Sequence, residues 1–288
     1  MFYEVTGVGK PVVVLEAGIA ASSVSWELVR RELAQFTTVF TYDRAGLGRS
    51  PLARHRSTAL DAVRDLHRVL AKAGVPGPYV VVGHSFGGLV VRVFQQHYPE
   101  LVSGMVLLDP VARSEWALPT PDRARMLGRG VMLSRRGATL ARIGVVGLAL
   151  KLLTGGNRSI PKLLAKISAG RGAGIADRLV DEVKKLPREL WPVVAEQWSQ
   201  PNSFTAMANS LESLPVSAAQ LDESRGLGDL PLVVLSSDRS TPAALREHAA
   251  EASLSSRGRH TVLSNTGHWL QLDAPEAVCM AVRDVCKG

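Results

Sequence analysis

One short stretch in the first third of the chain constrains the fold most. Three β-branched residues, Val80–Val82, precede the turn Gly83-His-Ser-Phe-Gly87, and a helix-compatible run follows. This order predicts a buried strand that turns sharply into a helix with Ser85 at its tip, where the flanking glycines avoid collisions with the neighbouring strand and helix. The start of a helix also favours negative charge that develops beside it. The stretch therefore predicts an exposed serine nucleophile suited to acyl chemistry.

The hydrophobic pattern on both sides of this stretch predicts an α/β fold. Continuous apolar runs, which are typical of strands buried on both faces of a parallel sheet, alternate with helical patterns. The predicted strands are 2–5, 11–15, 38–42, 80–82, 105–108, 231–235 and 259–263, and the predicted helices are 26–34, 61–73, 89–97, 242–252 and 275–287. We therefore expect a mostly parallel central sheet with helices on both faces.

The alternation stops in the middle of the chain. Residues 111–228 are helix-like, interrupted by glycines and rich in arginine. A segment of this length is too long for an ordinary loop. We therefore predict one core formed by residues 1–110 and 229–288, with residues 111–228 inserted as a helical cap over the site.

Positive charge is concentrated in that insertion. The chain carries a formal net charge of +8, and residues 123–176 contain eleven Lys or Arg and no Asp or Glu. A solvated helical face is the ordinary interpretation. The alternatives are peripheral contact with an anionic membrane and binding of an anionic substrate, because basic and apolar residues interleave at 140–153. Nucleic acid is disfavoured, since the segment has no aromatic residue for base stacking.

The remaining composition points to an ordinary intracellular protein. The N-terminal residues lack a charged region followed by an apolar stretch, and no run is long enough to span a bilayer, so we expect a cytoplasmic location. Cys279 and Cys286 lie seven residues apart on one predicted helix, which is too far apart for a disulfide. We expect both to be thiols in the core. The histidines show no metal-ligand spacing. We expect neither a metal nor an organic cofactor.

A serine nucleophile needs a base, and the base needs a group that orients it. His268 lies in the loop after the last predicted strand, at the same carboxyl edge of the sheet as Ser85. Asp238 and Asp109 each follow a strand at this edge, and either could reach His268. We favour Asp238, because the acid usually lies in the loop after the strand that precedes the histidine strand.

Acyl chemistry also requires two donors for the oxyanion and a pocket for the substrate. We expect the main-chain N–H groups of Phe86 and Ile19 to be those donors, since Gly18 permits close approach in the loop after the second strand. The predicted pocket residues are Trp269, Trp26, Gly18 and Phe86, together with the cap residues Trp191, Trp198, Phe204 and Met207.

The motifs Gly83-His-Ser-Phe-Gly87, Asp43-Arg-Ala-Gly-Leu-Gly-Arg-Ser50 and Gly267-His268 together resemble those of the α/β-hydrolase superfamily in its capped, esterase- or lipase-like form. The resemblance covers residues 1–110 and about 229–288. In that family the segment after the second of these strands often reads His-Gly-x. Here it reads Ala17-Gly18-Ile19, preceded by Glu16, which keeps the main-chain donor and removes a polar histidine.

The resemblance implies a serine esterase that acts on small or lipid-like apolar esters. Ser85 disfavours the members that use an aspartate nucleophile, such as epoxide hydrolases and haloalkane dehalogenases. Three alternatives use the same residues: a carbon–carbon bond hydrolase, an amidase and a cofactor-free perhydrolase. A fourth, from another class, is a small-molecule receptor on the same fold.

Overall fold

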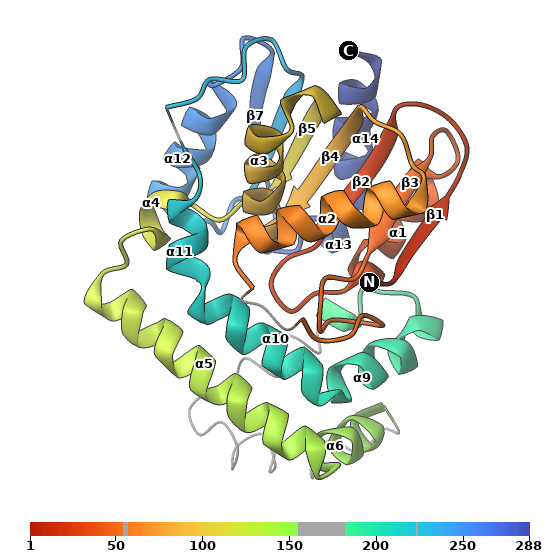
Figure 1. Cartoon of the computed structure of the whole chain (residues 1–288), viewed down its shortest axis with the longest axis vertical. Coiled ribbons are helices and arrows are strands. Elements are labelled where there is room, and N and C mark those ends of the chain that lie inside the picture. Colours follow the sequence, from red (N-terminus) through yellow and green to blue (C-terminus); the bar gives the residue numbers. More distant parts are fainter. Residues whose placement is uncertain (54–56, 155–181, 223) are drawn as a thin grey trace.

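A computed structural model of the chain describes residues 1–53, 57–154, 182–222 and 224–288. Its centre is a seven-stranded sheet in the order β1-β3-β2-β4-β5-β6-β7, in which only β1 is antiparallel to its neighbour (Figure 1). The strands are β1 (Tyr3–Thr6), β2 (Val12–Glu16), β3 (Val39–Tyr42), β4 (Tyr79–His84), β5 (Val102–Leu108), β6 (Leu232–Ser237) and β7 (Gly258–Leu263). The predicted mostly parallel sheet is confirmed.

Helices cover both faces of this sheet (Figure 1). One face carries α2 (Ala59–Ala73), α3 (Phe86–His97) and α12 (Pro242–Ala252), and the other carries α1 (Glu27–Leu33), α13 (Leu270–Asp273) and α14 (Pro275–Lys287). The helix α2 begins at a capping box, in which Thr58 and Asp61 satisfy each other's main-chain N–H groups, and it ends at Gly74 in the left-handed region.

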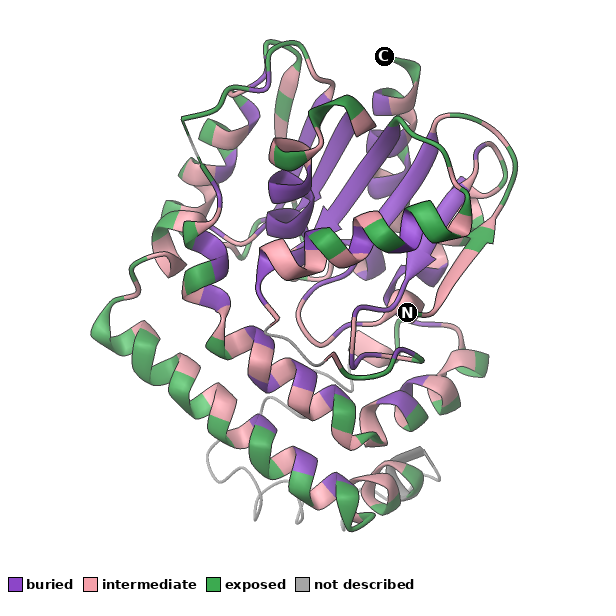
Figure 2. Cartoon of the chain, viewed as in Figure 1, coloured by how far each residue is buried: buried purple, intermediate pink, exposed green. Residues whose placement is uncertain are grey.

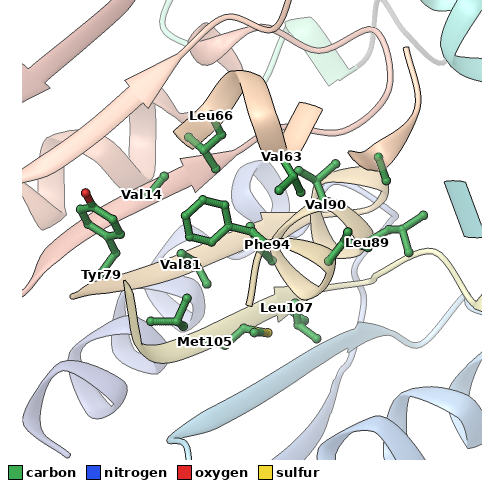
Figure 3. Close-up of a cluster of buried hydrophobic side chains, with 14 of the residues drawn as sticks. Val14, Val63, Leu66, Tyr79, Val81, Leu89, Val90, Phe94, Met105 and Leu107 are labelled. Atoms are coloured by element: carbon green, nitrogen blue, oxygen red, sulfur yellow. The ribbon is translucent and has the colours of Figure 1, made fainter. Parts of the chain in front are cut away.

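Side-chain alternation along the strands divides the apolar core into two clusters. Val14, Val81 and Leu107 face Leu66 and Phe94 of the helices on one side (Figure 3). Neighbouring strand residues such as Val13, Val80 and Val106 face α1 and α14 on the other side. The central strands are buried along their whole length, whereas much of β7 is exposed at the edge of the sheet (Figure 2).

Both cysteines belong to the C-terminal helix and both are free thiols. Cys279 is fully buried in the second cluster, and burial raises its pKa to about 12. Burial likewise raises the pKa of Cys286 to about 11. The prediction of a core thiol is confirmed for Cys279, whereas Cys286 is only partly buried and packs against the same cluster.

The described residues between β5 and β6 form helices that lie across the carboxyl ends of the strands (Figure 1). The helices of this segment are α4 (Arg113–Trp116), α5 (Pro121–Arg142), α6 (Val145–Thr154), α9 (Trp191–Ser199), α10 (Pro201–Glu212) and α11 (Leu214–Ala219). We call α5, α6, α9 and α10 the helical layer, and α5 packs alongside α10. The exact extent of a separate cap domain stays a prediction.

Seven of the eleven basic residues predicted to concentrate in the insertion lie on α5 and α6, and the other four lie outside the described residues: Arg158, Lys162, Lys166 and Arg171. The outward side of α5 is largely exposed (Figure 2). In the described ranges, no helix is both long enough and apolar enough to cross a membrane.

Candidate active site

Ser85 stands at the junction between β4 and α3 in a strained backbone conformation. Its φ of 54° and ψ of −117° are rare for a residue with a side chain. Three main-chain hydrogen bonds hold this turn: Ser85 N donates to Leu108 O at 2.9 Å, and Gly88 N and Val111 N donate to Ser85 O at 3.0 and 3.2 Å. The predicted sharp turn with Ser85 at its tip is therefore present.

The glycines on either side of Ser85 are required by contact with the backbone. A Cβ on Gly83 would lie 2.4 Å from Gly87 O, and a Cβ on Gly87 would lie 2.2 Å from Glu16 O. Real Cβ atoms do not approach so closely, so a larger residue at either position would push the turn apart. Gly87 thus brings the start of α3 directly against the loop after β2.

His268 is held by Asp109. His268 Nδ1 donates to Asp109 Oδ2 at 2.6 Å, and the other carboxylate oxygen accepts hydrogen bonds from Ser240 Oγ and Ser237 N. Burial alone would raise the pKa of Asp109, but these hydrogen bonds and the charge of His268 hold it below its ordinary value. Asp109 is therefore an ionised acceptor that orients the His268 ring.

The prediction of Asp238 as the acid is wrong in this geometry. Asp238 is exposed, and its Oδ2 accepts a hydrogen bond from Asn265 N at 2.8 Å. Its own N–H donates to the oxygen of Leu263, the last residue of β7, which keeps Asp238 in line with the sheet. Asp109, by contrast, has a φ of 42°, a turn at the end of β5 that brings its carboxylate to His268. Asp238 instead shapes the loop that leads to His268.

His84, the residue before Ser85, also holds His268. Its ring is buried, and Nε2 donates to the main-chain carbonyl oxygen of His268 at 2.8 Å. The amide of Gln271 donates to His84 Nδ1 at 3.3 Å, which fixes the neutral tautomer. Burial and the nearby His268 lower the pKa of His84 to about 3. No pattern in the sequence indicates this hydrogen bond between His84 and the loop that carries His268.

A buried charged cluster supports the loop expected to carry the second oxyanion donor. Glu16 is completely buried and accepts hydrogen bonds from Tyr42 Oη and from the Arg44 guanidinium. Arg44 also donates to Ala17 O and Gly18 O. Burial raises the pKa of Glu16, while Arg44 and Tyr42 oppose that rise. The cluster holds the carbonyl groups of Ala17 and Gly18 in place and thereby sets the orientation of the N–H groups of this loop.

The loop lies close to the nucleophile. A Cβ on Gly18 would lie 3.0 Å from His84 Nδ1 and 3.4 Å from Ser85 Cβ, so Gly18 packs beneath the site and does not line the open cavity. Ile19 does line the cavity that contains Ser85. In the part of the chain that the structure describes, no internal hydrogen bond engages the N–H of Ile19 or of Phe86. Both groups are therefore available to an oxyanion.

A cavity of about 1150 Å³ separates the sheet edge from the helical layer. Ser85, Asp109 and His268 line its floor. Its opposite wall comes from α5 and α10, and its apolar side chains include Met126, Leu133, Met207 and Leu211. Of the predicted cap residues, Met207 lines this cavity, whereas Trp191, Trp198 and Phe204 do not.

Besides Gly18, two further predicted pocket residues lie away from the cavity. Trp26 has no exposed surface and belongs to the core cluster beneath α1 and α14, because the 3₁₀ helix Ser23–Trp26 turns it inward. Trp269 packs against the His84 ring, with centroids 5.3 Å apart, and against a small apolar cluster that includes Leu186 and Leu272. Neither lines the cavity. Trp26 supports the fold, and Trp269 supports the loop that presents His268.

A parallel sheet with a strained serine after β4 and a histidine–aspartate pair at the same edge is the organisation of an α/β hydrolase. The chain belongs to the alpha/beta hydrolase family, whose sequence model matches residues 12–281. The predicted family and fold are thus confirmed.

Individual relatives are more distant. YqjL of Bacillus subtilis is 38% identical over 98 residues, which are 34% of this chain and 39% of that protein. RutD of Azorhizobium caulinodans, named as a candidate carbamate hydrolase, is 32% identical over 115 residues, 40% of this chain and 43% of that protein. The chain thus matches only about two-fifths of the length of these relatives. A solved esterase from Thermogutta terrifontis is 22% identical with a TM-score of 0.63, over 98% of this chain and 91% of that one. At that identity the likeness shows the fold alone.

Proposed function

We propose that this protein is a serine hydrolase that cleaves carboxylic esters through an acyl-enzyme. Ser85 is the nucleophile, His268 is the general base and acid, and Asp109 orients His268. The observation that carries the proposal is that a serine in a strained turn and a histidine held 2.6 Å from a buried carboxylate line one cavity. This is the arrangement by which a weak hydroxyl nucleophile is activated.

The reaction follows from these positions. His268 Nε2 takes the proton of Ser85 Oγ as Oγ attacks the ester carbonyl carbon. The N–H groups of Phe86 and Ile19 bind the oxyanion, and His268 then protonates the leaving alcohol. Water, deprotonated by His268, then attacks the acyl-enzyme carbonyl carbon. The bond to Ser85 Oγ breaks, His268 returns the proton to Oγ, and the acid is released.

The two reacting side chains share the cavity without a direct hydrogen bond between Ser85 Oγ and His268. Hydrogen bonds of this kind often form fully only when substrate is bound. His84 holds the main chain of His268 and Asp109 holds its ring, so the position of the base is fixed before substrate binds.

The apolar side chains that α5 and α10 present to the cavity favour substrates with an apolar acyl or alcohol part. The likeness to RutD adds carbamate esters as a second substrate class, because a carbamate presents the same electrophilic carbonyl to a serine nucleophile. The helical layer then acts as the cap that limits the size of the substrate.

The test is hydrolysis of 4-nitrophenyl esters from acetate to palmitate, with a 4-nitrophenyl carbamate as a further arm. Wild type is compared with Ser85→Ala and with Ser256→Ala, which removes an exposed hydroxyl between α12 and β7. We expect turnover in wild type and Ser256→Ala and loss of at least about a thousandfold in Ser85→Ala. Equal turnover in the two variants would contradict the proposal.

A further inference from the structure

Three arginines line the proposed substrate cavity. Arg129 and Arg136 come from α5, and Arg239 comes from the loop after β6. None of the three makes an ion pair or a side-chain hydrogen bond within the described residues. All three are exposed, so their charged ends can reach a hydrated group at the cavity mouth.

The carboxylates of the same cavity are already engaged. Asp109 is bound to His268 and Ser240. Glu115 pairs with Arg123 at 2.7 Å and accepts a hydrogen bond from Thr241 at 3.1 Å. Within the described part of the chain, the cavity therefore keeps an excess of positive charge that no lining carboxylate neutralises.

Four of the arginines of α5 fall into two groups. Arg125 and Arg135 do not line the cavity. Arg125 pairs with Asp122, and Arg135 pairs with Glu212. Arg129 and Arg136 lie seven residues apart with Leu133 between them, so they share one helical face and stand about 10 Å apart along it. That face lines the cavity together with Met126. Apolar and cationic groups thus alternate along one wall.

We propose that this cavity selects esters that carry an anionic oxyacid group, a carboxylate or a phosphate, separated from the scissile carbonyl by an apolar chain. The guanidinium groups offer paired N–H donors that match such a group, and the methionine and leucine side chains take the chain between. This inference rests on the proposed ester hydrolysis at Ser85 and specifies its substrate class.

Two esters of equal chain length test it: mono(4-nitrophenyl) suberate, which ends in a carboxylate, and 4-nitrophenyl octanoate, which does not. One triple variant carries Arg129→Gln, Arg136→Gln and Arg239→Gln. The control triple carries Arg68→Gln, Arg125→Gln and Arg225→Gln, which removes the same charge from exposed arginines that pair with carboxylates on the surface.

We expect wild type and the control to prefer the suberate ester at low ionic strength. The cavity variant should lose at least about tenfold in kcat/KM for that ester, mainly through KM, and stay within twofold for octanoate. Added salt should weaken the preference in wild type. If the ratio of kcat/KM for the suberate ester to kcat/KM for the octanoate ester is equal in the two triple variants, the inference is overturned.

A binding measurement separates this inference from the catalytic proposal. Calorimetry with Ser85→Ala compares monomethyl suberate with methyl octanoate, and hexyl phosphate serves as the phosphate arm. We expect Ser85→Ala to bind the anionic ligands preferentially and to lose this preference when the three cavity substitutions are added. That result supports the inference even if no ester is turned over. Binding of phosphatidylglycerol vesicles that needs these three arginines, with no preference among soluble ligands, would assign them to a lipid surface and overturn it.

Discussion

His268 and Asp109, 159 residues apart in the chain, meet at 2.6 Å between Nδ1 and Oδ2. The contact joins the loop after β7 to the end of β5, and β6 lies between these two strands. A positive φ at Asp109 turns its carboxylate towards His268, and the Ser240 hydroxyl and the Ser237 N–H both donate to its other oxygen. The position of the acid therefore depends on the shape of the β5 end, which no local sequence pattern displays.

Replacement of the two candidate acids should separate their roles. We expect Asp109→Asn to lower kcat by about a hundredfold or more, because the amide no longer stabilises the charged His268 ring. Asp238→Asn should leave kcat within a few-fold, since Asp238 only holds Asn265 N. Steady-state kinetics with the best ester, alongside circular dichroism to verify folding, gives the comparison. A larger loss in Asp238→Asn would refute the assignment.

The hydrogen bond from His84 to the His268 carbonyl should matter for turnover. We expect His84→Phe to reduce kcat about tenfold or more with little change in KM, because the His268 loop loses a buried anchor. His84→Gln can still donate to this carbonyl and should recover much of the rate. If both variants fall equally, a purely structural role for the imidazole ring is the better explanation.

His84 should also make stability depend on pH. Its pKa in the folded protein is about 3, against about 6.5 for an unperturbed histidine. The unfolded chain therefore binds the proton first, and stability falls as the pH decreases from about 6.5 towards 3. Urea unfolding at pH 7 and pH 5 should show a smaller decrease for His84→Gln than for wild type. An unchanged decrease would mean that His84 is not held neutral.

Removal of one partner of the buried Glu16–Arg44 ion pair should lower the free energy of unfolding substantially. Arg44→Gln leaves a buried carboxylate without its cation, and we expect a loss of about 3–5 kcal/mol in the free energy of unfolding. Arg68→Gln, which removes an exposed partner of Asp65, should cost less than about 1 kcal/mol. Chemical unfolding of both variants measures the difference. Similar values would show that the buried pair contributes no more than a surface pair.

Two glycine-to-alanine replacements should act in opposite directions. Gly87→Ala places a methyl group within 2.2 Å of Glu16 O and should reduce both stability and activity. A Cβ on Gly128 of α5 meets nothing within 4 Å, so Gly128→Ala should stabilise the protein by about 0.5–1 kcal/mol. Thermal unfolding distinguishes them, and a stable, fully active Gly87→Ala protein would contradict the described packing of the turn.

The sequence predicted what depends on neighbours in the chain. The apolar runs of β2, β4 and β5 and the turn around Ser85 carry their own signals, because burial and backbone geometry act locally there. His268 followed from its place after the last strand. What the sequence did not reveal depends on contacts between distant segments: the choice of Asp109 over Asp238, and the burial of Trp26 in place of a role in the pocket.

The supporting residues of the site were hidden for the same reason. Glu16, Tyr42 and Arg44 come from β2 and from the end of β3, and only the pairing of these two strands brings them together. One signal was present in the sequence: an acidic residue ends an otherwise apolar strand. A buried carboxylate at such a position needs a cation, and Arg44 follows the neighbouring strand.

The most direct test of the account is covalent labelling with a fluorophosphonate, which reacts with activated serine nucleophiles, followed by mass spectrometry of the digested protein. We expect one adduct, on Ser85, and no labelling of folded Ser85→Ala or His268→Ala protein. A label on another serine, or labelling of Ser85 that persists at the wild-type rate in His268→Ala, would contradict the account.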